Sequence, residues 1–163
     1  MQFQMRSLIF HFHTMGFTNR RNMNIFEALR KRHDNKRQWV FIEECPVGTG
    51  YQCKNFLDAF AISCFESEKN KRVCYEVKVS RSDFLSEMKK PYKRRMGLIM
   101  SNEFYFVTPK GMLKIEEVPY ECGLMEFDGE RIYISLRAPH RESIRPSWNM
   151  VTSLLRKVGK NEI

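Results

Sequence analysis

The sequence predicts an α/β protein whose central sheet mixes parallel and antiparallel strands. Segments rich in β-branched and aromatic residues, at 38–45, 55–62, 73–79 and 103–108, are typical of strands. Short connections join the first three, as in an antiparallel meander. A helical segment separates the third from the fourth, which favours a parallel crossover. We therefore expect an α-β-β-β-α-β core with helices on the faces of the sheet.

Two capping patterns define where the helices of this core begin. Asn24 is followed three residues later by Glu27, and Ser80 is followed by Asp83. A short polar side chain followed by an acid at this spacing can satisfy the free N–H groups of a first helical turn. The first helix is expected to run to about residue 33 and the second to about residue 88.

The remaining elements are expected around this core. Pro91 should break or restart the helical pattern, which continues as a second piece over 89–100. Further, more peripheral strands are expected at 112–118 and 131–136, followed by an amphipathic helix at 147–158.

The length of 163 residues predicts a single domain, which we place at 23–163. Residues 1–22 show no clear periodicity and are expected to form an N-terminal extension. No run of about 18 apolar residues is present, and the five cysteines contain no C-x-x-C spacing. These features favour a soluble, cytoplasmic protein with reduced cysteines and no membrane partner.

The formal net charge is +9 and the pI is about 9.5. Such a balance favours a polyanionic partner, most simply nucleic acid. The densest basic run lies just after the second helix. A patch that follows the DNA backbone and a solvated basic face are both compatible with this run. Its members are Lys89, Lys90, Lys93, Arg94 and Arg95.

Three charged residues stand inside two adjacent apolar strands. Asp58 lies in the second expected strand, and Glu76 and Lys78 lie in the third. Glu76 and Lys78 are two residues apart, so their side chains point to the same face. Charge on a buried strand is costly unless it is paired or bound to a metal.

Two interpretations of this cluster follow from the residues alone. Asp58 and Glu76, with the backbone carbonyl of Val77, could hold Mg²⁺ or Mn²⁺ for phosphodiester hydrolysis, and Lys78 could orient water or stabilise negative charge. The alternative is a buried ion-pair cluster without a metal, in an unrelated basic interaction protein. Both interpretations remain open at this point.

The pattern resembles the PD-(D/E)XK nuclease superfamily, whose motif matches Asp58 and the segment 76–78 in this element order. Residues 76–84 (EVKVSRSDF), followed by Lys89, Tyr92 and 104–109 (FYFVTP), are similar to the MmcB-like DNA-repair branch. The similarity covers about residues 24–127. Leu57 stands where the nominal proline of the motif would be, a position that is commonly replaced.

The resemblance implies a restriction-endonuclease-like fold and a hydrolase: a metal-dependent DNA endonuclease or exonuclease in DNA repair, recombination or phage DNA metabolism. Glu27 or Glu44 would be a further metal-binding acid, although a capping role also explains Glu27 and a solvated strand end is the favoured explanation of Glu44. Ser80 and Tyr92 could contact the substrate, but helix capping and packing would also explain them. A non-catalytic DNA-binding module on the same fold is the main alternative. A homodimer suits an enzyme that cuts two strands, but no residue marks an interface.

Overall fold

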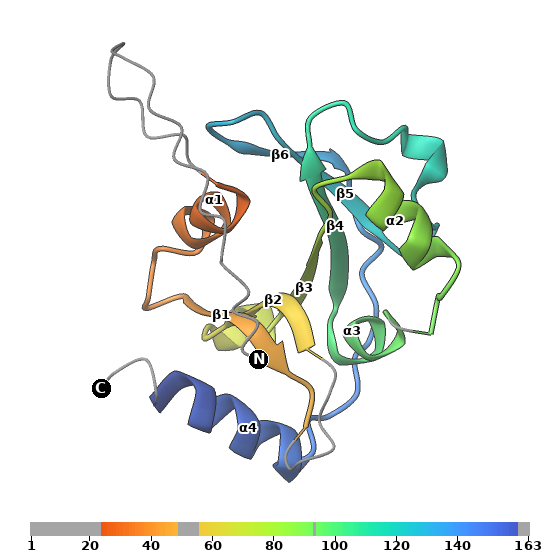
Figure 1. Ribbon diagram of the computed structural model, residues 1–163. Coiled ribbons are helices and arrows are strands. Elements are labelled where there is room, and N and C mark those ends of the chain that lie inside the picture. Colours follow the sequence, from red (N-terminus) through yellow and green to blue (C-terminus); the bar gives the residue numbers. More distant parts are fainter. Residues whose placement is uncertain (1–23, 49–55, 93, 160–163) are drawn as a thin grey trace, which may run out of the picture.

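The computed structural model describes residues 24–48, 56–92 and 94–159. Six strands form one open, mixed sheet whose spatial order follows the chain, and four α-helices pack around it (Figure 1). The predicted α/β class and mixed sheet are therefore confirmed. The expected N-terminal extension, 1–22, lies outside the described residues.

The first half of the sheet is the expected meander. After helix α1 (Ile25–Arg32), strands β1, β2 and β3 pair antiparallel in succession. A single 3₁₀ turn, η1 (Glu66–Glu68), lies in the polar connection between β2 and β3. The three strands span Trp39–Pro46, Phe56–Ser63 and Arg72–Val77.

The second half begins with the expected crossover. Helices α2 (Arg81–Met88) and α3 (Arg95–Met100) connect β3 to β4 (Glu103–Pro109), which runs parallel to β3. The sheet then continues with β5 (Gly123–Phe127), parallel to β4, and β6 (Ile132–Leu136), antiparallel to β5.

The prediction of a strand at 112–118 is wrong. This segment contains the 3₁₀ turn η2 (Ile115–Glu117) instead. The Glu117 carboxylate accepts the backbone N–H of Lys114 at 2.9 Å and also binds the Arg81 guanidinium, so side-chain contacts fold the segment back on itself. Pro119 follows and has no N–H to donate to a ladder. The next strand in the chain, which pairs with β4 on the side away from β3, is β5, and the apolar pattern did not predict it.

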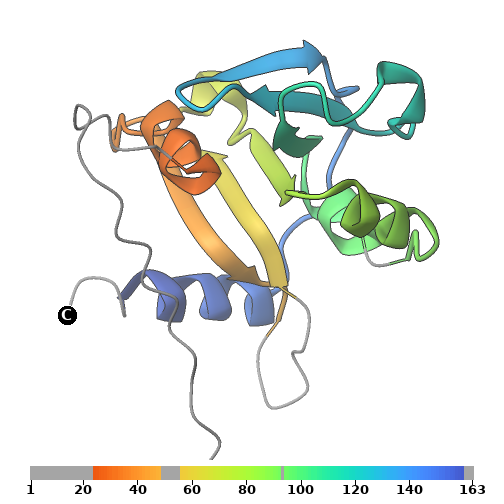
Figure 2. The ribbon, with the colours of Figure 1, turned by 45° about the horizontal axis from the view of Figure 1, so that its top comes forward.

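Helix α1 lies on one face of the sheet and helices α2 and α3 lie on the other (Figure 2), and an apolar layer covers each face. On one face, Ile25 and Leu29 of α1 pack with Tyr75 of β3 and Tyr105 of β4. On the other face, the core contains residues of α2, α3 and α4 together with alternating positions of the same strands, including Phe60, Phe84, Met100, Phe106 and Met150. Period-two alternation in the strands thus separates an α1 face from an α2–α3 face.

Both capping predictions are confirmed. Asn24 and Glu27 exchange side-chain and backbone hydrogen bonds at 2.9 Å each, and Ser80 accepts the backbone N–H of Asp83 at 3.3 Å. The helix expected at 147–158 is α4 (Trp148–Gly159), which packs against β1. None of the helices in the described ranges has the length and apolar character needed to cross a bilayer.

Candidate active site

The acidic residues singled out in the sequence meet where the β2–β3 ladder ends. Ala59 pairs with Tyr75 in the antiparallel register, so the next position along each strand places Asp58 opposite Glu76. Phe60 lies two residues from Asp58 and Cys74 lies two residues from Glu76, so each shares a face of its strand with that acid. Phe60 and Cys74 both belong to the α2–α3 core. Asp58 and Glu76 therefore point to the α2–α3 face of the sheet.

A hydrogen bond ties Asp58 to the third strand. Its carboxylate accepts the backbone N–H of Val77 at 2.8 Å, beyond the last backbone pair of the two strands. On the other side of β3, the N–H of Lys78 is donated to the carbonyl of Val107 at 3.0 Å. The backbone that carries Glu76 and Lys78 is thus held from both neighbouring strands.

Lys78 is buried among acids. Its side chain is only 8 % exposed, and its Nζ lies 2.8 Å from Glu76, 3.7 Å from Asp83 and 3.8 Å from Glu87. Asp83 and Glu87 both come from α2, one helical turn apart. Glu87 is 94 % buried (6 % exposed) and was missed by sequence reasoning, although its spacing from Asp83 places both on one side of that helix.

The cluster holds more negative than positive charge. Burial, reinforced by the neighbouring Asp58, raises the pKa of Glu76 to about 7. Burial also raises the pKa of Asp58, although the Val77 N–H and Lys78 oppose this shift. Burial acts to lower the pKa of Lys78, but its hydrogen bond to Glu76 and the surrounding acids outweigh that effect and raise it. The site would gain free energy from a further cation.

The oxygen donors at this site suit Mg²⁺, or an ion like it, better than a structural metal ion that protein ligands enclose completely. Within the described ranges, no three His, Cys, Asp or Glu side chains converge closely enough to hold an ion by themselves. Mg²⁺ usually binds one or two carboxylates and completes its shell with waters and substrate oxygens. Asp58 and Glu76, which lie opposite each other on β2 and β3, supply two carboxylates of this kind.

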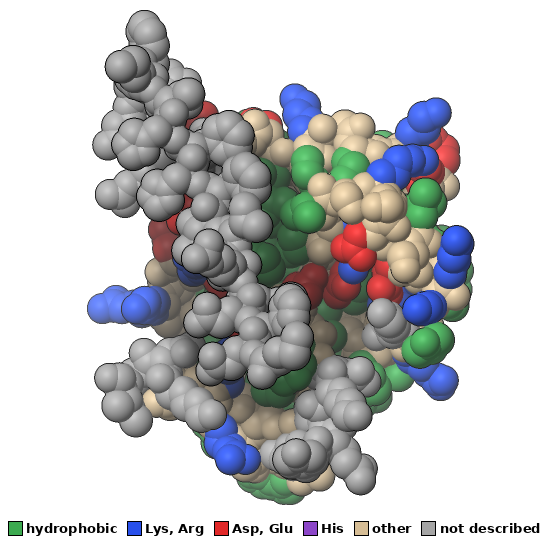
Figure 3. Space-filling model, in the orientation of Figure 1, with side chains coloured by type: hydrophobic (Ala, Val, Ile, Leu, Met, Phe, Trp, Pro, Cys, Tyr) green, Lys and Arg blue, Asp and Glu red, His purple; other side chains and the backbone are tan. Residues whose placement is uncertain are grey.

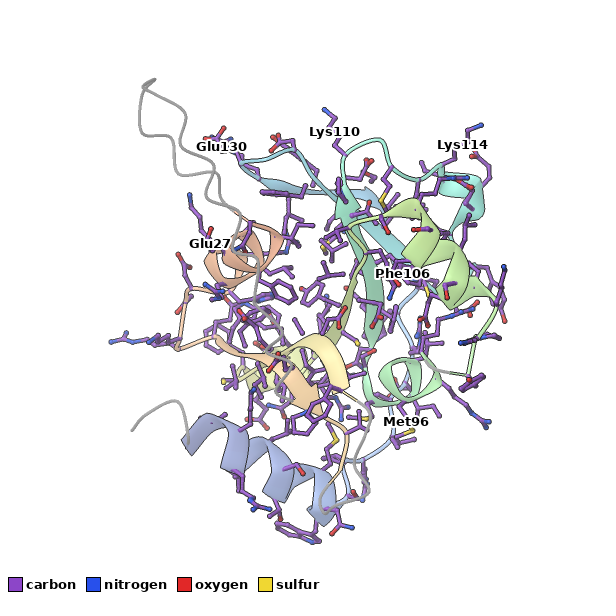
Figure 4. The ribbon with its side chains drawn as sticks, in the orientation of Figure 1. Glu27, Met96, Phe106, Lys110, Lys114 and Glu130 are labelled. Atoms are coloured by element: carbon purple, nitrogen blue, oxygen red, sulfur yellow. The ribbon has the colours of Figure 1, made fainter. Side chains whose placement is uncertain are left out.

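The two further acids of the expected metal site point elsewhere. The Glu27 carboxylate is engaged by the Asn24 N–H, and α1 lies on the opposite face of the sheet from α2 (Figure 4). Glu44 has a positive φ of 48° and is 80 % exposed, and its carboxylate lies 3.3 Å from Lys157 of α4. The structure brings neither carboxylate to Glu76.

The basic run is divided by burial. Lys89, Lys90 and Arg95 are exposed, whereas Arg94 is 8 % exposed and pairs with Glu121 at 3.1 Å. Arg94 therefore joins two loops instead of facing solvent, and Lys93 lies outside the described residues.

The two polar candidates near this run also differ. Tyr92 is 69 % exposed, so core packing does not account for it, whereas Ser80 has the capping role described above. On the face shown in Figure 3, acidic side chains gather near the centre beside α2, and Lys and Arg side chains lie toward the outer margin.

Comparisons with known proteins identify a similar fold but give no information on activity. No family model matches the chain, and no curated protein matches it. A solved structure, the SPO1766 protein of unknown function from Silicibacter pomeroyi, is similar with a TM-score of 0.54 and 21 % identity. The match covers 80 % of this chain and 79 % of that chain. At this level of identity the likeness shows a shared fold alone.

Proposed function

We propose that this protein is a divalent-metal-dependent deoxyribonuclease of the PD-(D/E)XK type, with a restriction-endonuclease-like core. One observation carries the proposal: Asp58, Glu76 and Lys78 converge at one end of the β2–β3 ladder, and both acids have raised pKa values. In a cluster that only stabilises the fold, acids in excess around one lysine would repel one another without compensation. In a site that binds a cation, the cation offsets this repulsion.

Each residue has a distinct role in this proposal. Asp58 and Glu76 would hold Mg²⁺ or Mn²⁺, with the Val77 carbonyl as a further ligand. When bound, such an ion supplies an activated water and charge stabilisation at the phosphorus. Lys78 orients that water or stabilises negative charge on the scissile phosphate. The Val77 N–H keeps the Asp58 carboxylate in place before the ion arrives.

DNA is the substrate that the surface charge favours. The exposed cations Lys89, Lys90 and Arg95 follow α2 in sequence, and α2 contributes two of the acids around Lys78. Backbone phosphates would bind to these cations with a strong dependence on salt. Tyr92, exposed in the same connection, offers a ring on which a base can stack.

The proposal is tested by incubating the full chain with labelled single-stranded, duplex, flapped and branched DNA in Mn²⁺, Mg²⁺ or EDTA. We expect metal-dependent cleavage that is lost in Asp58→Asn and Lys78→Met and retained in Lys110→Gln. Lys110 lies at the outer edge of the molecule and serves as a charge-matched control (Figure 4). A folded wild type that binds DNA without cutting it would make the protein a non-catalytic binding module.

A further inference from the structure

A second site lies on the α1 face of the sheet, opposite the acidic cluster. A cavity of about 420 Å³ opens between the C-terminal end of α1 and strands β3 to β6. Its apolar walls include Val73, Met125 and Ile134. Its volume lies within the range of about 300–1,000 Å³ that is typical of small-molecule sites.

The charges around this cavity favour an anion. Arg32, Lys71 and Arg137 line it together with a single acid, Glu103. Glu103 is already engaged, because Lys71 lies 2.7 Å from one of its oxygens and the Tyr105 hydroxyl donates to the other at 3.2 Å. Arg32 and Arg137 are exposed and have no carboxylate partner within the described ranges. The lining thus has two positive charges in excess, which matches the charge of about −2 on a phosphate monoester at neutral pH.

A buried polar pair forms one wall of the cavity. The His33 Nε2 lies 2.8 Å from the Tyr75 hydroxyl, and His33 is 6 % exposed. The other ring nitrogen, Nδ1, is buried without a hydrogen-bond partner among the described residues. Burial, with a contribution from Arg32, lowers the pKa of His33 to about 4, so the ring is neutral near pH 7. A buried ring nitrogen without a partner is costly, and a ligand or water that reached it would relieve that cost.

Aromatic rings define the shape of the ligand. Trp39, which is partly exposed, lines the cavity beside His33, with ring centroids 4.7 Å apart, whereas Tyr75 and Tyr105 are buried beneath it. The partly exposed Trp39 ring offers a surface for a ring-bearing body, which a free inorganic ion would not use.

We propose that this cavity binds a phosphate monoester carried on a small ring-bearing body, of the size of a nucleoside monophosphate. Arg32 and Arg137 bind the phosphate at the mouth, and Trp39 contacts the ring. This proposal does not depend on cleavage of DNA by Asp58, Glu76 and Lys78.

Isothermal titration calorimetry of the full chain in EDTA tests the proposal. The probes are deoxyadenosine 5′-monophosphate, deoxyadenosine, inorganic phosphate and a 5′-phosphorylated tetranucleotide. We expect one monophosphate per chain, with deoxyadenosine and phosphate bound at least tenfold more weakly. Arg32→Gln and Arg137→Gln should each weaken binding about tenfold or more, whereas Arg131→Gln should not; Arg131 is an exposed, charge-matched control just before β6 that does not line the cavity.

The remaining outcomes show whether the ligand is a free nucleotide or the end of a DNA strand, and which of the two sites binds it. Equal affinity for the phosphorylated tetranucleotide would assign the ligand to a strand end, and weaker affinity would assign it to a free nucleotide; either supports the proposal. Absence of saturable monophosphate binding would overturn it. Binding that is lost in Asp58→Asn and unchanged in both arginine variants would also overturn it, because the ligand would then occupy the acidic site.

Discussion

The Asp58 carboxylate is hydrogen-bonded to the backbone N–H of Val77 at 2.8 Å, which fixes one acid of the candidate site to the strand that carries the other. This contact explains how a charged side chain is tolerated at a position that is only partly exposed. It also separates the two roles of Asp58. An amide oxygen can accept the same N–H, but it cannot replace the charge that binds a cation.

The Asp58→Asn variant should therefore fold and lose its response to metal. We expect the free energy of unfolding in EDTA to change by less than about 1 kcal/mol, because the hydrogen bond is kept and repulsion with Glu76 falls. Urea unfolding with and without Mn²⁺ measures both effects, and only the wild type should be stabilised by the ion. A loss of about 3–5 kcal/mol in EDTA would instead identify Asp58 as the partner of a structural ion pair.

The raised pKa of Glu76 predicts how stability depends on pH without metal. Its pKa is about 7 in the folded protein against an ordinary value of 4.5, so the folded state holds more protons between these two values. The contribution of this group to the free energy of unfolding should therefore be greatest below about pH 4.5, and about 3 kcal/mol of it should be lost as the pH rises through 7.

Urea unfolding in EDTA at several pH values between 5 and 8 measures this slope. Glu76→Gln should flatten it, and Mg²⁺ should offset the loss at pH 8, because the ion favours the ionised acid. An identical slope in Glu76→Gln would contradict the assignment of the titration to Glu76.

Removal of the Lys78 charge should destabilise the protein in a pH-dependent way. In Lys78→Met, Glu76 and Glu87 lose their nearest cation while they remain mostly buried. We expect a loss of about 3–5 kcal/mol at pH 8 and a smaller loss at pH 5, where Glu76 is protonated. The matched control is Lys157→Met, which breaks a pair with the exposed Glu44 and should cost about 1 kcal/mol or less. Equal losses at both pH values would show that Lys78 acts through packing alone.

The exposed cations after α2 should contribute to DNA affinity through phosphate contacts. Substitution of Lys89, Lys90 or Arg95 by Gln should weaken binding to all sequences alike. Each should also reduce the slope of log affinity against log salt by about one, as fluorescence anisotropy would measure. Lys110→Gln and Lys114→Gln are controls, since both side chains lie at the upper margin of the view, in the segment that follows β4 (Figure 4). Equal effects of controls and test variants would point to non-specific attraction by net charge.

The sequence predicted the first half of the fold better than the second. Segments with dense apolar residues between charged turns gave β1, β2, β3 and β4 within two residues. The segments at 112–118 and 123–127 are similarly apolar, and their difference depends on Glu117, whose carboxylate contacts Lys114 and Arg81. Such a contact over 36 residues is not visible in a local pattern.

The candidate site shows the same division. Asp58, Glu76 and Lys78 were visible because charge is rare inside an apolar strand. Glu87 was missed because an acid on a short polar helix is usually solvated. The pairing of His33 with Tyr75, 42 residues apart, depends on how α1 packs on the sheet. Burial of Arg94 likewise depends on Glu121, in a loop with no predicted structure.

The most direct test of a nuclease is the single-turnover rate of DNA cleavage by the wild type and by Asp58→Asn at saturating Mn²⁺, on the best substrate of the panel. The predicted result is metal-dependent cleavage by the wild type and a rate at least about 10³-fold lower in the variant, since loss of a metal ligand removes several kcal/mol of transition-state stabilisation. Equal rates in the two proteins, or cleavage by the wild type that persists in EDTA, would contradict the proposed site.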